Sequence, residues 1–129
     1  MNKILVQVSV GELLDKISIL EIKKEKIKDP EKLKFIIDEH VILKEQLDQN
    51  VKSSDKLNKL FQSLKEINAK LWVIEDDKRM CEKESDFTQN FIKLSRDVHF
   101  LNDERAMIKL KINELTGSII KEIKEYQSY

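Results

Sequence analysis

The sequence contains very few residues that interrupt helices. Only 2 glycines and 1 proline occur among 129 residues, while 37% of the residues are charged. A chain with so few breakers and so many strong helix formers is typical of long helices and argues against a sheet-rich domain. We therefore expect an all-α fold, and the length indicates a single helical domain covering residues 1–129.

Cysteine and long apolar runs are scarce as well. The one cysteine, Cys81, cannot form an internal disulfide and has no CxxC motif, so neither a disulfide scaffold nor a catalytic thiolate is expected. The sequence shows no secretion signal and no apolar run long enough to cross a bilayer. We therefore expect a cytoplasmic protein without a membrane partner.

The chain also lacks an excess of either charge. Its 24 lysines and arginines balance 24 acidic residues, which disfavours the electrostatic binding that nucleic acids require, so no nucleic-acid partner is expected. Histidine is limited to His40 and His99, too few for a cluster of metal ligands, and no cofactor is expected. His40 falls on an apolar stripe and is predicted to be a paired core or boundary residue.

Two pairs of carboxylates nevertheless have the spacing found in magnesium sites of all-α nucleotide pyrophosphohydrolases. Glu12 and Asp15 are one helical turn apart, as are Glu45 and Asp48, and their helices would be neighbours. Glu12 is also expected to cap a helix, and both pairs lie off the apolar stripes, where carboxylates are usually solvated. Solvated helix faces are the favoured interpretation, and a metal site is the alternative.

Apolar residues recur three and four positions apart along most of the chain, which predicts four main helices. The expected ranges are 10–28, 30–49, 55 to beyond 78, and 86–115, with a short C-terminal helix at 119–126. Ser9 and Glu12 fit a capping box, Pro30 suits a first helical position, and Asp86 is a candidate cap. Residues 4–10 alternate and are β-branched, which predicts a short N-terminal strand or extended arm.

The connections are short, so successive helices should be antiparallel neighbours. The predicted fold is an antiparallel helical bundle of one shorter and one long helical hairpin. Counting residues from each turn places Asn68 near Arg105 and the turn between the first two helices near Glu75. Residues 76–97 would protrude with apolar side chains covered by only one partner helix. A second copy of the chain is the expected cover, which predicts a homodimer.

Arg105 interrupts the apolar stripe of the last long helix. An arginine at such a position must be paired or reach solvent, because an uncompensated buried charge is costly. Candidate partners are Asn68 on the facing helix and Asn102, Asp103 and Glu104 beside it. A polar layer that fixes the register of the helices is the favoured interpretation, and a ligand site is the alternative.

Two stripes of alternating charge are also expected to face one another across the long hairpin. They consist of Glu75, Arg79 and Glu82 on one helix and of Arg96, His99 and Asp103 on the other. Exposed pairs of this kind are common and individually weak, which favours a solvated, salt-bridged face. The alternative is an anion pocket in which Arg79, Arg96 and Arg105 hold a phosphate or carboxylate.

Two motifs, IN-x-x-LW-x-IEDD at residues 67–77 and ND-x-RA-x-IK-x-x-IN at residues 102–113, combine with the run at 8–21. Together they resemble an uncharacterised family of small helical proteins from bacteria and their viruses. Relatives occur beside or fused to glycosyltransferase-like and helical-repeat proteins, which implies a link to surface-glycan synthesis. The tail at 121–129 is longer than in those relatives. The family pattern implies a shared site at Asn68, Trp72, Glu75, Asp76, Arg79, Glu82, Arg96, Asn102, Asp103, Arg105 and Asn113.

Two functions remain open on the sequence. The first is an oligomeric helical interaction or ligand-binding module that presents the long hairpin to a protein partner or a small anionic ligand. The second is a helical enzyme acting on a phosphorylated or nucleotide-linked substrate, in which Glu75, Glu82 or Asp103 supplies acid, base or metal contact. A ligand site requires the charged side chains to converge in a pocket. The predicted site residues are Asn68, Glu75, Arg79, Glu82, Arg96, Asn102, Asp103 and Arg105.

Overall fold

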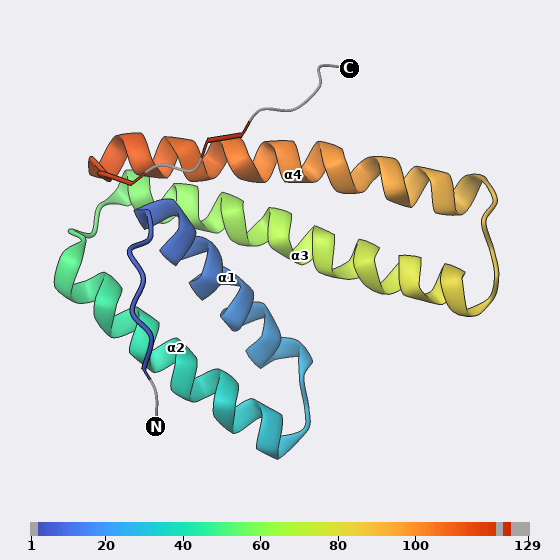
Figure 1. The fold of residues 1–129 in the computed structure, drawn as a ribbon, viewed down its shortest axis with the longest axis horizontal. Helices are drawn as coiled ribbons and strands as arrows, with labels where there is room; N and C mark the ends of the chain where they lie inside the picture. The colour runs from blue at the N-terminus through green and yellow to red at the C-terminus, as the bar shows by residue number, and fades with distance from the viewer. Residues whose placement is uncertain (1–2, 121–122, 125–129) are drawn as a thin grey trace.

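The computed structural model, which describes residues 3–120 and 123–124, consists of four α-helices joined by short connections (Figure 1). The helices are α1 (Val10–Lys26), α2 (Pro30–Asn50), α3 (Asp55–Lys83) and α4 (Gln89–Thr116). No described residue lies in a strand, so the all-α prediction is confirmed for this part of the chain. None of the described helices is long and apolar enough to span a bilayer.

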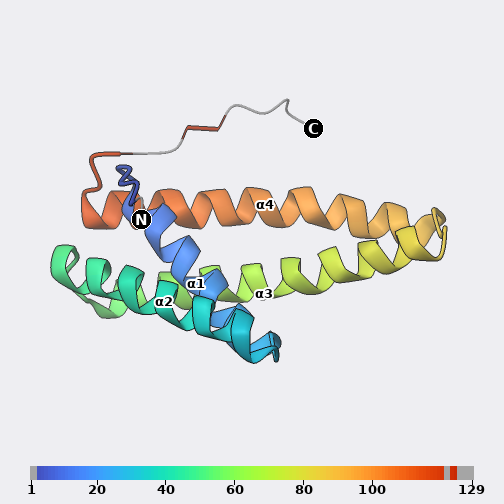
Figure 2. The same cartoon turned by 60° about the horizontal axis from the view of Figure 1, so that its bottom comes forward.

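The helices form two antiparallel hairpins that cross one another. α1 packs against α2, α3 and α4, whereas α2 approaches only α1 among the described helices. The oblique path of α1 is visible in Figure 2, and Lys65 of α3 donates a hydrogen bond of 3.1 Å to Glu25 near the end of α1. The first turn therefore lies beside Lys65, and its expected position near Glu75 is wrong because residue counting assumed parallel hairpins.

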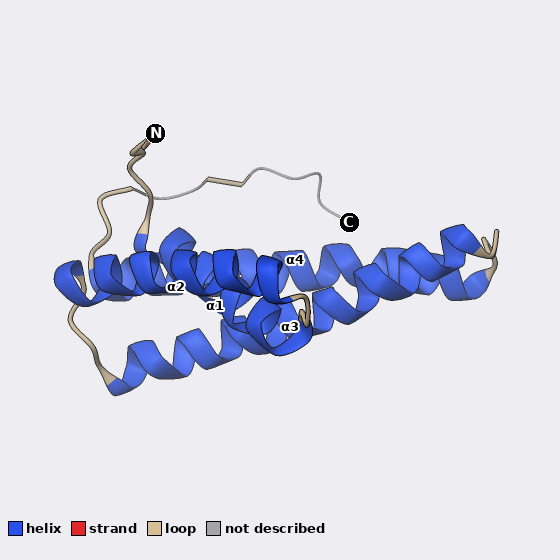
Figure 3. Cartoon of the chain, turned by 90° about the horizontal axis from the view of Figure 1, so that it is seen from below, coloured by secondary structure: helices blue, strands red, loops and turns tan. Residues whose placement is uncertain are grey.

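The far end of the α3–α4 hairpin extends well beyond the shorter hairpin in every view (Figure 1, Figure 2 and Figure 3). The tip covers part of its own apolar surface, because the rings of Phe87 and Phe91 pack edge to face with centroids 5.4 Å apart. The ammonium group of Lys78 lies 6.0 Å from the Phe91 ring centroid. Phe87 and Ile92 nevertheless remain about half exposed.

The apolar core lies at the end of the molecule where the two hairpins cross. Leu14 of α1, Leu57 and Leu64 of α3 and Ile112 of α4 are buried against one another. Each of these residues belongs to an apolar stripe with helical spacing, so burial of the stripes drives the packing of α1 onto the long hairpin. The core therefore joins α1, α3 and α4, and the partly buried Leu47 of α2 packs against it.

The start of α1 is secured by side chains from both ends of the chain. The first amide groups of a helix lack partners within it. Ser9 Oγ accepts a hydrogen bond from the Glu12 amide at 3.0 Å, and Asn113 Oδ1 of α4 accepts one from the Gly11 amide at 2.7 Å. The Ser118 hydroxyl accepts one from the Val10 amide at 3.2 Å. The predicted Ser9 cap is confirmed, and α4 supplies further caps that local sequence did not reveal.

The N-terminal segment, residues 3–9, is an extended arm without strand pairing. Its side chains Ile4, Leu5 and Val6 are 73–90% exposed. A strand requires hydrogen bonds to a partner strand, and no described segment provides one. The strand alternative for residues 4–10 is therefore wrong.

The C-terminal part of the prediction also needs correction. α4 ends at Gly117, which has the left-handed backbone conformation (φ 66°) common after helices. Residues 119, 120, 123 and 124 are not helical, and the rest of the predicted helix at 119–126 lies outside the described residues. At the other end, α4 begins at Gln89 after Thr88, because Asp86 accepts a hydrogen bond from the Thr88 amide (3.1 Å) instead of capping the helix.

Gly11 permits the closest approach of α1 to α4. A Cβ atom at this position would lie 2.6 Å from the backbone oxygen of Lys109 and 3.0 Å from Asn113 Oδ1. Because a backbone oxygen cannot move aside by a rotamer change, we expect Gly11→Ala to lower the free energy of unfolding by about 1–3 kcal/mol. Urea denaturation measures this loss. Lys16→Ala on the exposed face should change it by less than about 0.5 kcal/mol, and an equal loss there would contradict the explanation.

Lys65 joins α3 to α1 through ion pairs with Glu21 (3.2 Å) and Glu25 (3.1 Å). Partial burial acts to lower the pKa of Lys65, but its hydrogen bonds to the two glutamates and their negative charges outweigh this effect and raise the pKa above 10.5. Its stabilising contribution is therefore complete below pH 10.5 and is lost as the pH rises through the folded-state pKa.

The free energy of unfolding should consequently fall more steeply above pH 10.5 in the wild-type protein than in Lys65→Met. Urea denaturation at several alkaline pH values provides the comparison. Lys59→Met, a change at an exposed position of the same helix, should keep the wild-type slope. Parallel slopes for the wild type and Lys65→Met would show that the ion pairs contribute no pH-dependent stability.

Candidate functional site

A cluster of polar side chains is buried where α1 crosses α3 and α4. We call this cluster the junction; it consists of Glu12, Asp15, Ser18, Asn68, Arg105 and Lys109. Asp15 lies at its centre and is only 2% exposed. A carboxylate at this depth must be neutralised and hydrogen-bonded, because an isolated buried charge is strongly unfavourable.

Arg105 and Asn68 meet this requirement together. Arg105 Nε donates a hydrogen bond to Asp15 Oδ1 at 2.9 Å, and Arg105 Nη2 donates a second one to Asp15 Oδ2. Asn68 Nδ2 donates a third, to Asp15 Oδ1, at 2.8 Å. The planar guanidinium matches the two carboxylate oxygens in the bidentate geometry that makes such pairs strong. The pair thus ties α1 to α4, and Asn68 adds α3.

The remaining members complete the junction. The Ser18 hydroxyl donates to the backbone oxygen of Asp15 at 2.8 Å and accepts from Asn68 Nδ2 at 2.8 Å. Lys109 Nζ donates to Glu12 Oε2 at 2.7 Å and lies 4.0 Å from Asp15 Oδ2. Within the described residues, every buried side-chain nitrogen and oxygen atom has a hydrogen-bond partner. A fully satisfied cluster of this kind fixes the register of three helices.

Sequence reasoning identified part of the junction and missed its centre. Asn68 and Arg105 were expected to be close, and both donate hydrogen bonds to Asp15. Asn102 was also expected beside Arg105, and its Oδ1 accepts a long hydrogen bond of 3.4 Å from Arg105 Nη1. Asp15 was expected to be solvated, which is wrong. The overlooked signal is the spacing of Gly11, Asp15 and Ser18, which places small and polar residues on one face of α1, and all three are buried.

The alternative of a magnesium site conflicts with these contacts. Glu12 and Asp15 are ion-paired with Lys109 and Arg105 respectively, so their oxygens already have cationic partners. On α2, Asp48 pairs with Lys44 at 3.4 Å. The described residues contain no group of three or more side chains of metal-ligand type.

Beside the junction lies an open pocket of about 350 Å³ between α1 and the overhanging part of α3. We call it the junction pocket. Asn68 and Arg105 belong to both the pocket and the junction, so the buried cluster forms one wall of the pocket. The lining residues are Ile19, Asn68, Leu71, Trp72, Glu75, Asp76, Arg79 and Arg105.

Three exposed charged residues distinguish the pocket from the junction. Glu75, Asp76 and Arg79 are exposed, and no hydrogen bond or ion pair engages them within the described part of the chain. They surround Trp72, the only tryptophan of the protein, which is partly buried. Because Arg105 is directed to Asp15, Arg79 is the pocket cation that remains to meet a ligand. The pocket is therefore of mixed charge.

Four of the eight predicted site residues line the junction pocket: Asn68, Glu75, Arg79 and Arg105. The other four do not. Asn102 contacts Arg105 from behind, and Asp103 is partly buried on α4. Arg96 lies with its guanidinium carbon 6.0 Å from the Phe100 ring centroid, and Glu82 is exposed further towards the hairpin tip. Arg79 and Arg105 thus line the junction pocket together, whereas Arg96 does not line it.

His40 and Cys81 have structural surroundings. His40 Nε2 lies 3.4 Å from Glu21 Oε2 at the α1–α2 interface, which agrees with a paired boundary histidine. Cys81 is buried near the hairpin tip, and Asn90 Nδ2 donates to its Sγ at 3.6 Å. Burial raises the pKa of the Cys81 thiol, and nearby carboxylates raise it further, with Asp86 the strongest of them. Both effects oppose formation of a thiolate nucleophile.

Comparison with known proteins agrees with the expectation of an uncharacterised family. The model of a family of unknown function, DUF6165, matches residues 4–129. The chain therefore belongs to this family, which makes it one of a class of small helical proteins without an assigned activity. Neither a curated protein nor a solved structure matches the chain.

The pairing of Asp15 with Arg105 can be tested by a double-mutant cycle. We expect Arg105→Met to lower the free energy of unfolding by about 3–5 kcal/mol, because it leaves the carboxylate of Asp15 buried without its arginine. Asp15→Leu should lower it by less, because the side chain of Arg105 is 29% exposed and retains access to solvent. The double variant should lose much less than the sum of the two. Urea denaturation provides the values.

Glu114→Gln is a suitable control, since this exposed α4 residue lies outside the junction and should change stability by less than about 0.5 kcal/mol. Additive losses in the double variant would mean that the two side chains act independently.

Proposed function

We propose that the protein is a helical binding module whose junction pocket holds a small ligand with several hydroxyl groups and one anionic group, as in a sugar phosphate. The observation that carries this proposal is that three charged side chains, which have no partners among the described residues, line one pocket with a single tryptophan. Glu75, Asp76 and Arg79 come from two successive turns of α3 and line the same pocket. Such convergence is expected of a ligand site and not of a solvated helix face.

The chemistry of the three side chains defines the ligand. Ionised carboxylates only accept hydrogen bonds, so Glu75 and Asp76 require a ligand that donates, such as one with hydroxyl groups. Arg79 only donates, and its planar guanidinium suits a phosphate. Two carboxylates against one available arginine disfavour a ligand with many negative charges. A singly phosphorylated polyol or sugar fits this balance better than a nucleoside triphosphate.

The apolar part of the pocket supports the same class of ligand. Trp72 offers a flat surface against which the non-polar face of a ring can pack, and Ile19 and Leu71 line the pocket beside it. A volume of about 350 Å³ lies near the lower end of the range for small-molecule sites. A monosaccharide derivative suits this volume better than a complete nucleotide sugar.

An accessory role in surface-glycan synthesis is part of the proposal. The family resemblance described above implies this link, and a sugar phosphate is a chemically consistent ligand for it. The second candidate is an enzyme acting on the same ligand, with Glu75 or Asp76 as general base. The observation that favours this enzyme is the position of two carboxylates next to Arg79, where a bound phosphate would lie. Turnover of a bound sugar phosphate would distinguish the enzyme from a binding module.

The only tryptophan of the chain makes ligand binding directly measurable. We expect titration with hexose 1-phosphates or hexose 6-phosphates to change the fluorescence of Trp72 and to raise the melting temperature. Arg79→Ala should raise the dissociation constant at least about tenfold, a loss of about 1.4 kcal/mol, because the phosphate loses its bidentate donor. Free hexose and inorganic phosphate, each carrying half of the recognised groups, should bind more weakly than the intact sugar phosphate.

Arg96→Ala provides the matched control, since Arg96 is an exposed arginine of the same hairpin that does not line the pocket. The dissociation constant of this variant for the sugar phosphate should equal that of the wild type. Equal weakening by both substitutions would indicate non-specific attraction of the anion. A panel that changes neither fluorescence nor melting temperature would contradict the proposal, and release of inorganic phosphate in the same mixtures would support the enzyme.

A further inference from the structure

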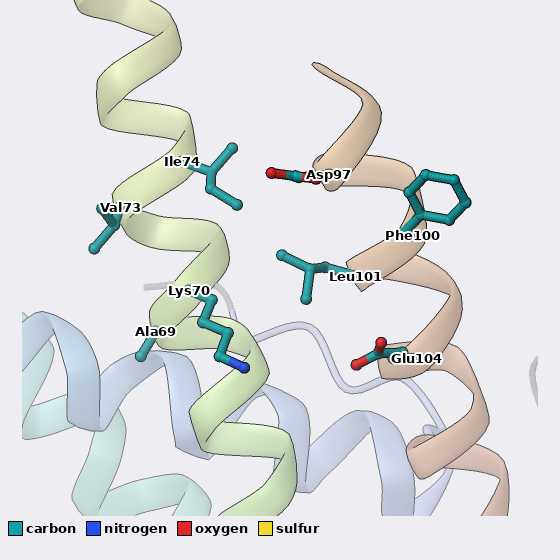
Figure 4. Close-up of a pocket in the computed structure, with 8 residues that line it drawn as sticks. All are labelled: Ala69, Lys70, Val73, Ile74, Asp97, Phe100, Leu101 and Glu104. Atoms are coloured by element: carbon teal, nitrogen blue, oxygen red, sulfur yellow. The ribbon is translucent and has the colours of Figure 1, made fainter. Parts of the chain in front are cut away.

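A second concave surface lies on the flank of the α3–α4 hairpin that faces away from α1. Figure 4 shows it with α1 and α2 behind the long hairpin. Ile74 of α3 and Leu101 of α4 point towards one another and form the floor, while Val73 and Phe100 lie on opposite rims. The groove has a volume of about 680 Å³ and is mainly apolar.

The apolar rims of the groove are open to solvent. Val73 is 49% exposed and Phe100 is 40% exposed, although each sits next to a floor of aliphatic side chains. Exposed apolar side chains that adjoin one another in a groove are candidates for contact with a partner.

Two opposite charges lie at one level of the groove. Lys70 and Glu104 point towards one another across it in Figure 4. No ion pair of either residue occurs in the described part of the chain, and both are exposed. Asp97 also points into the groove in Figure 4, but it pairs with Lys93 of its own helix at 2.6 Å. Lys70 and Glu104 therefore remain as a positive group on one helix and a negative group on the other, an arrangement that is complementary to itself after a two-fold rotation about the groove axis.

The exposed area of the chain is large enough for such an association. The chain exposes 9749 Å², whereas a compact monomer of 15.3 kDa is expected to expose about 7100 Å². The chain thus exposes about 2600 Å² more than a compact monomer of its mass. A stable interface requires only about 800 Å² from each partner.

We propose that a second copy of this chain docks in the groove, with the two-fold axis parallel to the long hairpin. In this arrangement α3 of one protomer faces α4 of its partner at the same level. Lys70 of each protomer pairs with Glu104 of the partner subunit, and Phe100 and Val73 from both protomers pack over the shared apolar floor. The interface is isologous and closed, so assembly stops at the dimer.

The groove and the junction pocket are independent surfaces. Lys70 and Trp72 are two residues apart on α3, which places their side chains about 200° apart around the helix. Dimerisation through the groove therefore leaves Trp72 and Arg79 accessible. The proposed dimer and the proposed ligand site can each be tested without the other.

The first experiment is light scattering of the full chain after size-exclusion chromatography, at concentrations up to about 100 µM so that weak association is also detected. We expect the mass of a dimer for the wild type and of a monomer for Phe100→Glu, which introduces a charge on the rim that packs against the partner subunit. Phe35→Glu is the matched control, because Phe35 is a more exposed phenylalanine on the outer face of α2. It should remain dimeric, and circular dichroism should show that all three proteins are equally helical.

The second experiment uses charge reversal. Lys70→Glu and Glu104→Lys each place like charges opposite one another in the homodimer, so each variant alone should dissociate with a dissociation constant at least about tenfold above that of the wild type. An equimolar mixture of the two variants can form a heterodimer in which both contacts again join opposite charges. The mixture should therefore show the mass of a dimer, as the wild type does. Structural damage to single chains could not be repaired by mixing.

Two results would overturn the proposal. They are a wild-type protein that is monomeric throughout the concentration range and a dimer that survives Phe100→Glu. If the surviving dimer were dissociated by Phe35→Glu, the interface would be assigned to α2. Failure of the mixed variants to associate would overturn the proposed orientation of the two protomers.

Discussion

The buried carboxylate of Asp15 is the constraint on which the arrangement of the helices depends. Its charge is excluded from solvent, so the fold must bring a cation and further donors to it from elsewhere in the chain. Arg105 provides two donors from α4 and Asn68 a third from α3. An apolar contact could tolerate a shift of α1 along the long hairpin, but three directional hydrogen bonds cannot. The crossing of the two hairpins is therefore specified by polar geometry as much as by the core around Leu64.

The same crossing creates the two exposed surfaces of the molecule. Because α1 covers only one flank of the long hairpin and only its near half, the junction pocket forms where this cover ends, and the opposite flank stays open. The satisfied hydrogen bonds of the junction make it a rigid wall for the pocket. Different residues therefore stabilise the fold and form the open surface of the pocket. The ion pair of Asp15 and Arg105 holds the helices together, while the exposed residues around Trp72 are available for a ligand.

Local patterns in the sequence were sufficient for the helices and insufficient for their packing. The apolar stripes, the cap at Ser9 and the proline at the first position of α2 predicted the four helices with ends close to those observed, because helix formation depends on neighbours within a few residues. Arg105 was recognised as anomalous because it interrupts a stripe. Its partner Asp15 was missed because the contact joins residues far apart in sequence, and no local rule predicts the angle at which α1 crosses α3. The arm at residues 4–10 shows the same limit, since alternation predicts a strand only where a partner strand exists.

The cap that Asn113 provides for Gly11 also has a consequence for synthesis of the chain. The contact spans 102 positions in sequence, so α1 cannot receive this cap until α4 has been synthesised. The α3–α4 hairpin, whose contacts are closer in sequence, can form before this docking. Until then, Leu14 of α1 can be covered by α2 and by Leu57 and Leu64 of α3, but not by Ile112 of α4. The docking of α1 is thus completed only after translation of residue 113.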